Sequence, residues 1–252
     1  MQEVLLTALG VGGATVIGAV FGLLFRKPSH KMQDVILAFA SGVMLAAAVV
    51  GLILPSLEYG DGAIGFGVSL AGIFCGALCL NVIDRVVPHL HKLTGIDKEV
   101  HPQKNEEIQK ILLFVIAIAI HNLPEGIAAG VGFGTGDLSQ ALTVAGGIAL
   151  QNIPEGMVII APMIAVGMTA RRSFLIAMLT GVVEVIGTLI GYFAVSISTM
   201  VLPFALAFAG GTMLYVISDE MIPETHAHGN ERAATYAILF GFCVMLAVDY
   251  FL

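Results

Sequence analysis

Two short motifs place acidic and amide side chains inside strongly apolar sequence. Residues 121–126 read HNLPEG and residues 151–156 read QNIPEG, and the first motif follows ten apolar residues at 111–120. In a helix, His121 and Glu125 are four residues apart and share one face, as do Gln151 and Glu155. Nitrogen and oxygen donors of this kind suit Zn²⁺, Fe²⁺, Mn²⁺, Co²⁺ and Cd²⁺. The motifs therefore predict a divalent metal site.

A third acid lies in the next apolar segment, where Glu184 stands inside FLIAMLTGVVEVIGTLIGYF. A charged side chain at the centre of a bilayer costs roughly 2.5–3.5 kcal/mol, so three acids would cost about 8–10 kcal/mol. One divalent ion would leave a charge of −1 and two would leave +1, and either is far easier to bury than −3; two ions could share Glu125 and Glu155 as bridges. The residues available to hold them are His121, Asn122, Glu125, Gln151, Asn152, Glu155 and Glu184.

Each motif also contains a proline within its apolar segment. Pro124 cannot donate to the carbonyl of Ile120, and Pro154 cannot donate to that of Leu150, so both helices are predicted to kink at the polar residues. Broken helices at membrane depth are tolerated where they line a cavity or a site. Because the two motifs fall on consecutive antiparallel segments, they predict an approximate two-fold axis in the membrane plane.

The composition is that of a membrane protein. Hydrophobic residues make up 58% of the 252 residues, charged residues 12%, and the mean hydropathy is +0.96. We expect an all-α integral membrane protein, a single transmembrane domain over residues 1–252, because the apolar runs do not alternate as strands of a barrel would. Basic residues are too few for a nucleic-acid partner, and the lipid bilayer is the expected environment. The eight predicted spans are 4–25, 33–56, 63–87, 110–132, 138–165, 172–196, 201–222 and 233–251.

The basic residues orient these spans. All eleven Lys and Arg residues follow spans 1, 3, 5 or 7, whereas the loops after even-numbered spans hold none. Basic residues prefer the cytoplasmic side, so the sequence predicts that both termini lie outside. The only long loop, about residues 88–109 after span 3, is then cytoplasmic; its histidines His89, His91 and His101 suit either metal capture or simple solvation.

At these residues the chain resembles the ZIP family of divalent metal transporters, and its bacterial GufA-like branch in particular. HNLPEG followed by QNIPEG is a specific signature, and the resemblance covers essentially the whole chain. It implies a two-metal site halfway along the transport path, with Glu125 and Glu155 as bridging ligands. The chain carries Gln151 where some members have a second histidine, and Asn152 where some have aspartate.

The resemblance also implies residues on either side of this site. The end of span 7, ISDEMIPETHAHG, exits on the predicted cytoplasmic side, and Ser41 and Met44 of span 2 are expected along the pathway by analogy. A homodimer is expected on the same basis, in a plasma membrane such as the bacterial inner membrane. The expected release-side ligands are Asp219, Glu220, Glu224, His226 and His228.

We therefore predict uptake of zinc or another divalent transition metal into the cytoplasm, with the metal as transported substrate and no organic cofactor. The runner-up function is an intramembrane metal-dependent hydrolase that uses the same cluster. No enzyme is expected, because the zincin pattern HExxH is absent and no base remains once the ligands are counted. A third class, a proton-coupled carrier of an organic substrate, predicts that chelating metal changes nothing.

Overall fold

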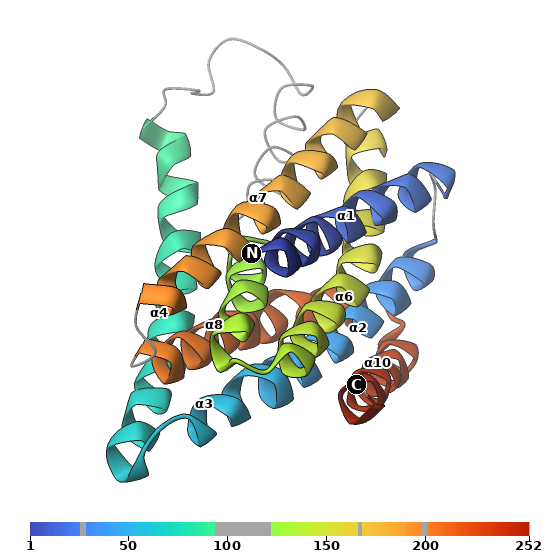
Figure 1. The fold of residues 1–252 in the computed structure, drawn as a ribbon. Helices are drawn as coiled ribbons and strands as arrows, with labels where there is room; N and C mark the ends of the chain where they lie inside the picture. Colours follow the sequence, from blue (N-terminus) through green and yellow to red (C-terminus); the bar gives the residue numbers. More distant parts are fainter. Residues whose placement is uncertain (26–28, 94–121, 166–167, 198–200, 252) are drawn as a thin grey trace.

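The computed structural model describes the chain except residues 26–28, 94–121, 166–167, 198–200 and 252 (Figure 1). Every regular element in the described part is helical. Residues 122–132 are also helical. The other elements are α1 (Gln2–Leu24), α2 (His30–Ala46), η1 (Ala47–Ile53), α3 (Leu54–Glu58), α4 (Gly62–Leu93), η2 (Phe133–Thr135), α6 (Leu138–Ala165), α7 (Ala170–Ile197), α8 (Leu202–Val216), η4 (Ile217–Met221), α9 (Ile222–Thr225) and α10 (Glu231–Phe251).

Seven stretches of helix in the described part are long and apolar enough to cross a membrane. They coincide, to within a few residues, with seven of the predicted spans. The predicted fourth span, 110–132, falls mostly outside the described residues, as does 94–109 of the predicted loop; α4 extends to Leu93. The all-α membrane fold is therefore confirmed, whereas the count of eight spans and the side of the termini stay predictions.

Two helices contain a π-helical segment just before a proline. α2 passes through η1 into α3, where Pro55 follows, and α8 passes through η4 into α9, where Pro223 follows. A π segment is a local widening that leaves some backbone groups without their usual partner, and such segments are frequent at functional sites. The sequence reasoning missed both. Pro154 lies inside α6, whose helical backbone continues through it, so the predicted kink there stays a prediction.

Glycines hold α1 and α7 at backbone contact. A Cβ atom on Gly12 of α1 would collide with the carbonyl oxygen of Gly181 in α7, and a Cβ on Gly181 would meet the carbonyl oxygen of Gly12 at 2.5 Å. Small residues at such crossings let helix backbones approach closely in a membrane. The contact is reciprocal, so the middle of α1 and the middle of α7 make the same interaction with each other.

The two motif helices dock onto this pair in the same way. Gly156 of α6 packs against the carbonyl of Thr15 in α1, and Gly126 packs against the carbonyl of Glu184 in α7. The outer helices repeat the pattern, because α2 packs on α10 as α8 packs on α4. Figure 1 shows α4 and α10 at opposite edges of the bundle. Because Gly156 packs on the Thr15 carbonyl as Gly126 packs on the Glu184 carbonyl, Thr15 of α1 and Glu184 of α7 occupy corresponding positions.

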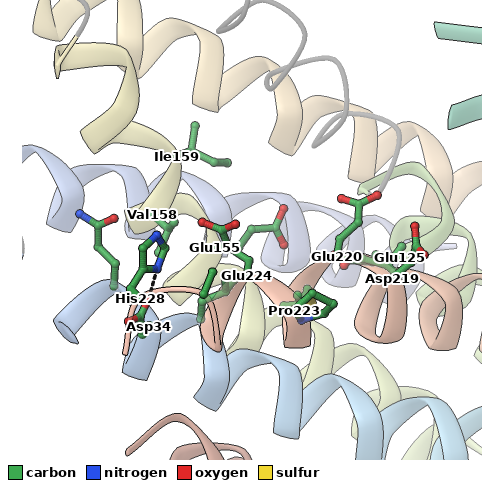
Figure 2. Close-up of a pocket in the computed structure, with 15 residues that line it drawn as sticks. Asp34, Glu125, Glu155, Val158, Ile159, Asp219, Glu220, Pro223, Glu224 and His228 are labelled. Atoms are coloured by element: carbon green, nitrogen blue, oxygen red, sulfur yellow. Dashed lines mark hydrogen bonds and ion pairs between the residues drawn. The ribbon is translucent and has the colours of Figure 1, made fainter. Parts of the chain in front are cut away.

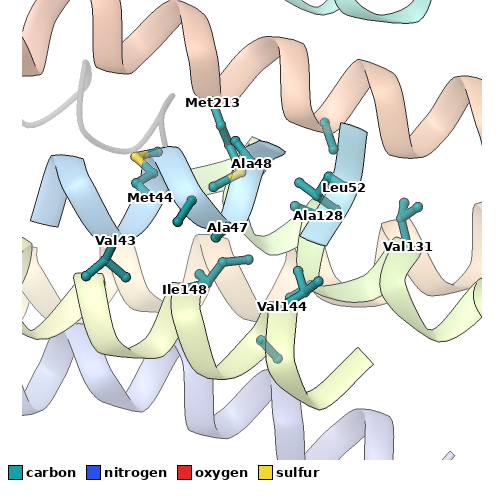
Figure 3. Packing of buried hydrophobic residues seen from close by; sticks show 14 of the residues in the cluster. Val43, Met44, Ala47, Ala48, Leu52, Ala128, Val131, Val144, Ile148 and Met213 are labelled. Carbon is teal, nitrogen blue, oxygen red and sulfur yellow. The ribbon is translucent and has the colours of Figure 1, made fainter. Parts of the chain in front are cut away.

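The larger of the two apolar clusters joins α2 and α8 to the motif helices (Figure 3). Met44, Leu52, Ala128, Ile148 and Met213 are each at most 1% exposed within it. Many of its other members are alanines, which allow the helices to lie close together. The cluster fixes the position of α2 and α8 relative to the residues that carry the two motifs.

Replacing Gly18 by alanine should destabilise the protein, because the new Cβ would overlap the carbonyl group of Ile153 in α6. Overpacking of this kind costs about 1–3 kcal/mol. Gly13→Ala in the same helix is the matched control, since no atom lies within 4 Å of its added Cβ. Unfolding in mixed micelles should separate the two variants. Equal stability would contradict the close packing of α1 on α6.

Candidate metal centre

The polar motif residues lie on three helices that meet inside the bundle. Asn122 and Glu125 come from residues 122–132, Gln151, Asn152 and Glu155 from α6, and Glu184 from the middle of α7. Asn122, Gln151, Asn152 and Glu184 are 0% exposed and Glu125 is 1% exposed. Glu155 is half-buried. Burial of so many polar groups in an apolar bundle requires that they satisfy one another or bind a ligand.

The Glu184 carboxylate accepts hydrogen bonds from three side chains. Thr15 Oγ1 donates to its Oε1 across 2.6 Å, and Asn152 Nδ2 donates to its Oε2 across 2.6 Å. Asn122 Nδ2 also donates to Oε1. Asn152 Nδ2 lies 3.2 Å from the carbonyl oxygen of Val11 as well, which ties the network to α1. Both carboxylate oxygens of Glu184 are therefore engaged by donors.

A continuous chain of hydrogen bonds joins this carboxylate to Glu125. Gln151 Nε2 donates to Glu125 Oε2 across 2.6 Å and also to Asn152 Oδ1, while Asn152 in turn donates to Glu184. These hydrogen bonds join five of the seven expected ligands, which are Asn122, Glu125, Gln151, Asn152 and Glu184. His121 lies outside the described residues. Glu155 belongs to the adjoining cavity.

That cavity has a volume of about 590 Å³ and reaches from the motif helices to the first turns of α2 (Figure 2). Figure 2 shows Glu155 and Glu224 between the Asp34–His228 pair and Glu125. Such a concentration of negative charge in a narrow space raises the local concentration of cations. The ionisable side chains that line it are Asp34, Glu125, Glu155, Asp219, Glu220, Glu224 and His228.

Four of the five expected release-side residues line this cavity, and His226 does not. Asp219 and Glu220 project from η4, and Glu224 lies in α9. His226 instead bonds locally, because its Nδ1 lies 2.9 Å from the carbonyl oxygen of Ile222 and its Nε2 lies 3.3 Å from Thr235 Oγ1. The π segment η4 therefore supplies acids to the cavity.

Asp34 is a cavity residue that the sequence reasoning missed. It is 3% exposed, and its carboxylate lies 2.9 Å from His228 Nδ1 and accepts a bond of 2.8 Å from Asn230 Nδ2. His30 stacks on His228 with ring centroids 5.1 Å apart. The sequence did contain a feature that could have indicated Asp34, because it is an acid at the start of the predicted second span and is followed by the apolar run VILAFA.

The two residues expected along the pathway are buried elsewhere. Ser41 donates to the carbonyl oxygen of Leu37 across 2.8 Å, and Met44 packs in the apolar cluster of Figure 3. Leu37, one turn earlier than Ser41, does line the cavity. Ser41 and Met44 are therefore close to the cavity wall in sequence but are not among its lining residues.

The donor set fits a divalent cation. Within the described residues, Asn122 Oδ1 and Gln151 Oε1 are buried side-chain oxygens without a hydrogen-bond partner, and amide oxygens are good ligands for such ions. No group of three His, Cys, Asp or Glu side chains in that part of the chain forms a ready-made metal cage. Any ion bound there must therefore draw on amides, or on residues beyond the described ones such as His121.

The chain was compared with known proteins. Residues 108–249 match the family model described as ZIP Zinc transporter. The chain is 41% identical to Zinc transporter GufA of Myxococcus xanthus, with 97% of each chain covered. It is 38% identical to Zinc transporter ZIPB of Bordetella bronchiseptica, with 94% of this chain and 77% of the relative covered, and 30% identical to Zinc transporter ZupT of Chlorobium chlorochromatii, with 94% and 92% covered. The chain therefore belongs to the ZIP family of zinc transporters.

Proposed function

We propose that this chain carries divalent transition metal ions, zinc among them, through a membrane into the cytoplasm. One observation supports this function above the others: the acid-lined cavity reaches the two motif carboxylates Glu125 and Glu155 deep in an apolar bundle. The relatives reported above, which are all named as zinc transporters, agree with it. The proposed ligands are His121, Asn122, Glu125, Gln151, Asn152, Glu155 and Glu184, with Glu125 and Glu155 bridging two ions.

The distribution of acids suggests how an ion leaves this site. Glu155 stands where the buried network meets the cavity, and Glu224 and Asp34 continue the acidic lining beyond it. A series of binding groups of similar chemistry lets an ion exchange ligands stepwise, without returning to bulk water at each step. Asp219, Glu220, Glu224 and His228 are the proposed release-side groups, whereas the local bonds of His226 argue against that role for it.

The packing supports a carrier with two parts. α1 packs on both α6 and α7, and the glycines of 122–132 pack on α7, so these four helices hold the whole polar network. α4 packs on α8, and α2 packs on α10, at the edges of the bundle. We propose that the four central helices move together against the others, with an approximate two-fold axis in the membrane plane. In this structure, the side of the carrier on which the cavity lies is the open side.

The alternatives have less support. An intramembrane hydrolase needs an open metal position beside a free base. The oxygens of Glu184 accept bonds from three donors, and Glu125 accepts a bond from Gln151. The relatives are named as transporters rather than enzymes. The names of these relatives refer to zinc and not to an organic substrate.

Glu125→Gln should abolish zinc uptake, because it replaces a proposed bridging carboxylate by a neutral amide of the same shape. The measurement is radioactive zinc entry into proteoliposomes, with peptide cleavage followed in parallel. We expect uptake at the level of protein-free vesicles for this variant and no cleavage for any. Asp249→Asn, an exposed acid at the end of α10, is the control and should transport normally. Normal uptake by Glu125→Gln would refute the proposed site.

The proposed orientation places the cavity mouth on the cytoplasmic side and Tyr59 outside. Cysteines introduced at Ala227, which lines the cavity, and at Tyr59, which is 40% exposed at the end of α3, report the two sides. In a background with Cys75, Cys79 and Cys243 replaced, an impermeant thiol reagent should label Tyr59→Cys in intact cells. It should label Ala227→Cys only after the membrane is opened. The reverse pattern would place the termini on the cytoplasmic side.

A further inference from the structure

Thr15 lies outside the two motifs, and among the described residues its hydroxyl is the one that donates to a carboxylate of the central network. Its side chain is 0% exposed in the middle of α1. Its Oγ1 donates to Glu184 Oε1 across 2.6 Å. The other donors to Glu184, Asn122 and Asn152, are themselves proposed metal ligands. Thr15 is therefore the donor best placed to remain on Glu184 when an ion engages the amides.

The repeated packing explains why a hydroxyl stands at this place. Thr15 corresponds to Glu184, since its carbonyl receives Gly156 as the carbonyl of Glu184 receives Gly126. The motif acids Glu125 and Glu155 correspond to each other in the same way. A strictly symmetric site would therefore contain four carboxylates, with the two on α1 and α7 in contact. Two like charges at that distance repel strongly, whereas a hydroxyl and a carboxylate attract.

We propose that Thr15 is a positioning residue for the metal site. This inference rests on the proposed function and assigns the role of holding Glu184 to a residue outside the motifs. The hydroxyl holds Oε1 of the carboxylate, which also accepts from Asn122, while Oε2 accepts from Asn152 of α6. A buried ligand whose orientation is fixed by a hydrogen bond binds its ion more tightly than a ligand that must be ordered on binding.

The hydrogen bond between Thr15 and Glu184 also links the proposed metal site to the position of α1. Thr15 lies on the face of α1 that packs against α6, and Asn152 of α6 bonds the Val11 carbonyl one turn earlier. α1 therefore contacts the proposed ligands through a side chain and through a backbone group. An ion that draws Asn152 away from Glu184 would leave Thr15 as the side chain that links α1 to the metal-bound carboxylate.

Thr15→Val tests this role, because valine keeps the shape of threonine and removes the hydroxyl. Zinc binding to the purified full chain is titrated calorimetrically, and zinc uptake is measured in proteoliposomes. We expect the Kd of one zinc per chain, and the KM for uptake, to rise by about 10-fold or more. Thr15→Ser, which keeps the hydroxyl, should restore values near those of the unmodified chain.

Two further comparisons separate positioning from general loss of structure. Thr212→Val removes another buried hydroxyl, which bonds only the Ala209 carbonyl of its own helix, and should leave zinc binding unchanged. In a Glu184→Gln background, adding Thr15→Val should cause little further loss, because the hydroxyl acts through that carboxylate. Should Thr15→Val not yield monodisperse protein, Thr15→Ala removes the same hydroxyl with less bulk.

The outcomes distinguish this inference from the proposed function. Zinc uptake by the unmodified chain, together with unchanged binding in Thr15→Val or additive losses in the double variant, would overturn the role of Thr15 and leave the function standing. Absence of both zinc binding and zinc uptake in the unmodified chain would overturn the function and this inference together. The role of Thr15 would be established if Thr15→Val weakened zinc binding, Thr15→Ser did not, and Thr15→Val caused little further loss in the Glu184→Gln background.

Discussion

The burial of carboxylates among apolar helices is the constraint on which the rest of this structure depends. Glu125 and Glu184 are at most 1% exposed. Each buried charge requires partners, and the chain supplies them as neutral donors: one hydroxyl and three amides. Because these donors are neutral, none of them forms an ion pair with either acid, and both acids remain able to pair with a cation.

Close helix packing is what makes this arrangement possible. Donors from α1 reach the carboxylate on α7 only because glycines bring the helices to backbone contact, as Gly12 and Gly181 do. The same contacts repeat for the two motif helices, so one packing rule builds both halves of the site. The repetition is broken where it would place a fourth acid, since α1 carries Thr15 opposite Glu184. The site is therefore symmetric in its backbone and asymmetric in its charge.

A transporter must bind its ion and also release it, and the cavity meets both requirements. The buried network offers carboxylates and amide oxygens, two of which lack hydrogen-bond partners among the described residues. The cavity lining continues the carboxylates toward the opening, where the Asp34–His228 pair joins α2 to the turn after α9. The π segment η4 contributes two of these acids to the cavity, and it also places Ile217 and Met221 in the larger apolar cluster. Family membership, with 41% identity to a protein named Zinc transporter GufA, agrees with metal as the transported substrate.

The sequence by itself determined the membrane class, seven of the spans that the structure describes, and the residues of the two motifs. It could do so because apolar length and helical spacing are local properties, readable from neighbouring letters. It did not reveal Asp34 as a cavity residue, the local bonds of His226, the π segments or the partner of Glu184. The cavity position of Asp34 and the hydrogen-bond partners of Glu184 depend on which helices touch, and the local backbone detail of the π segments and of His226 is not encoded in apolar length or spacing. Thr15 and Glu184 are 169 residues apart in the chain, and only the packing of α1 against α7 makes them neighbours.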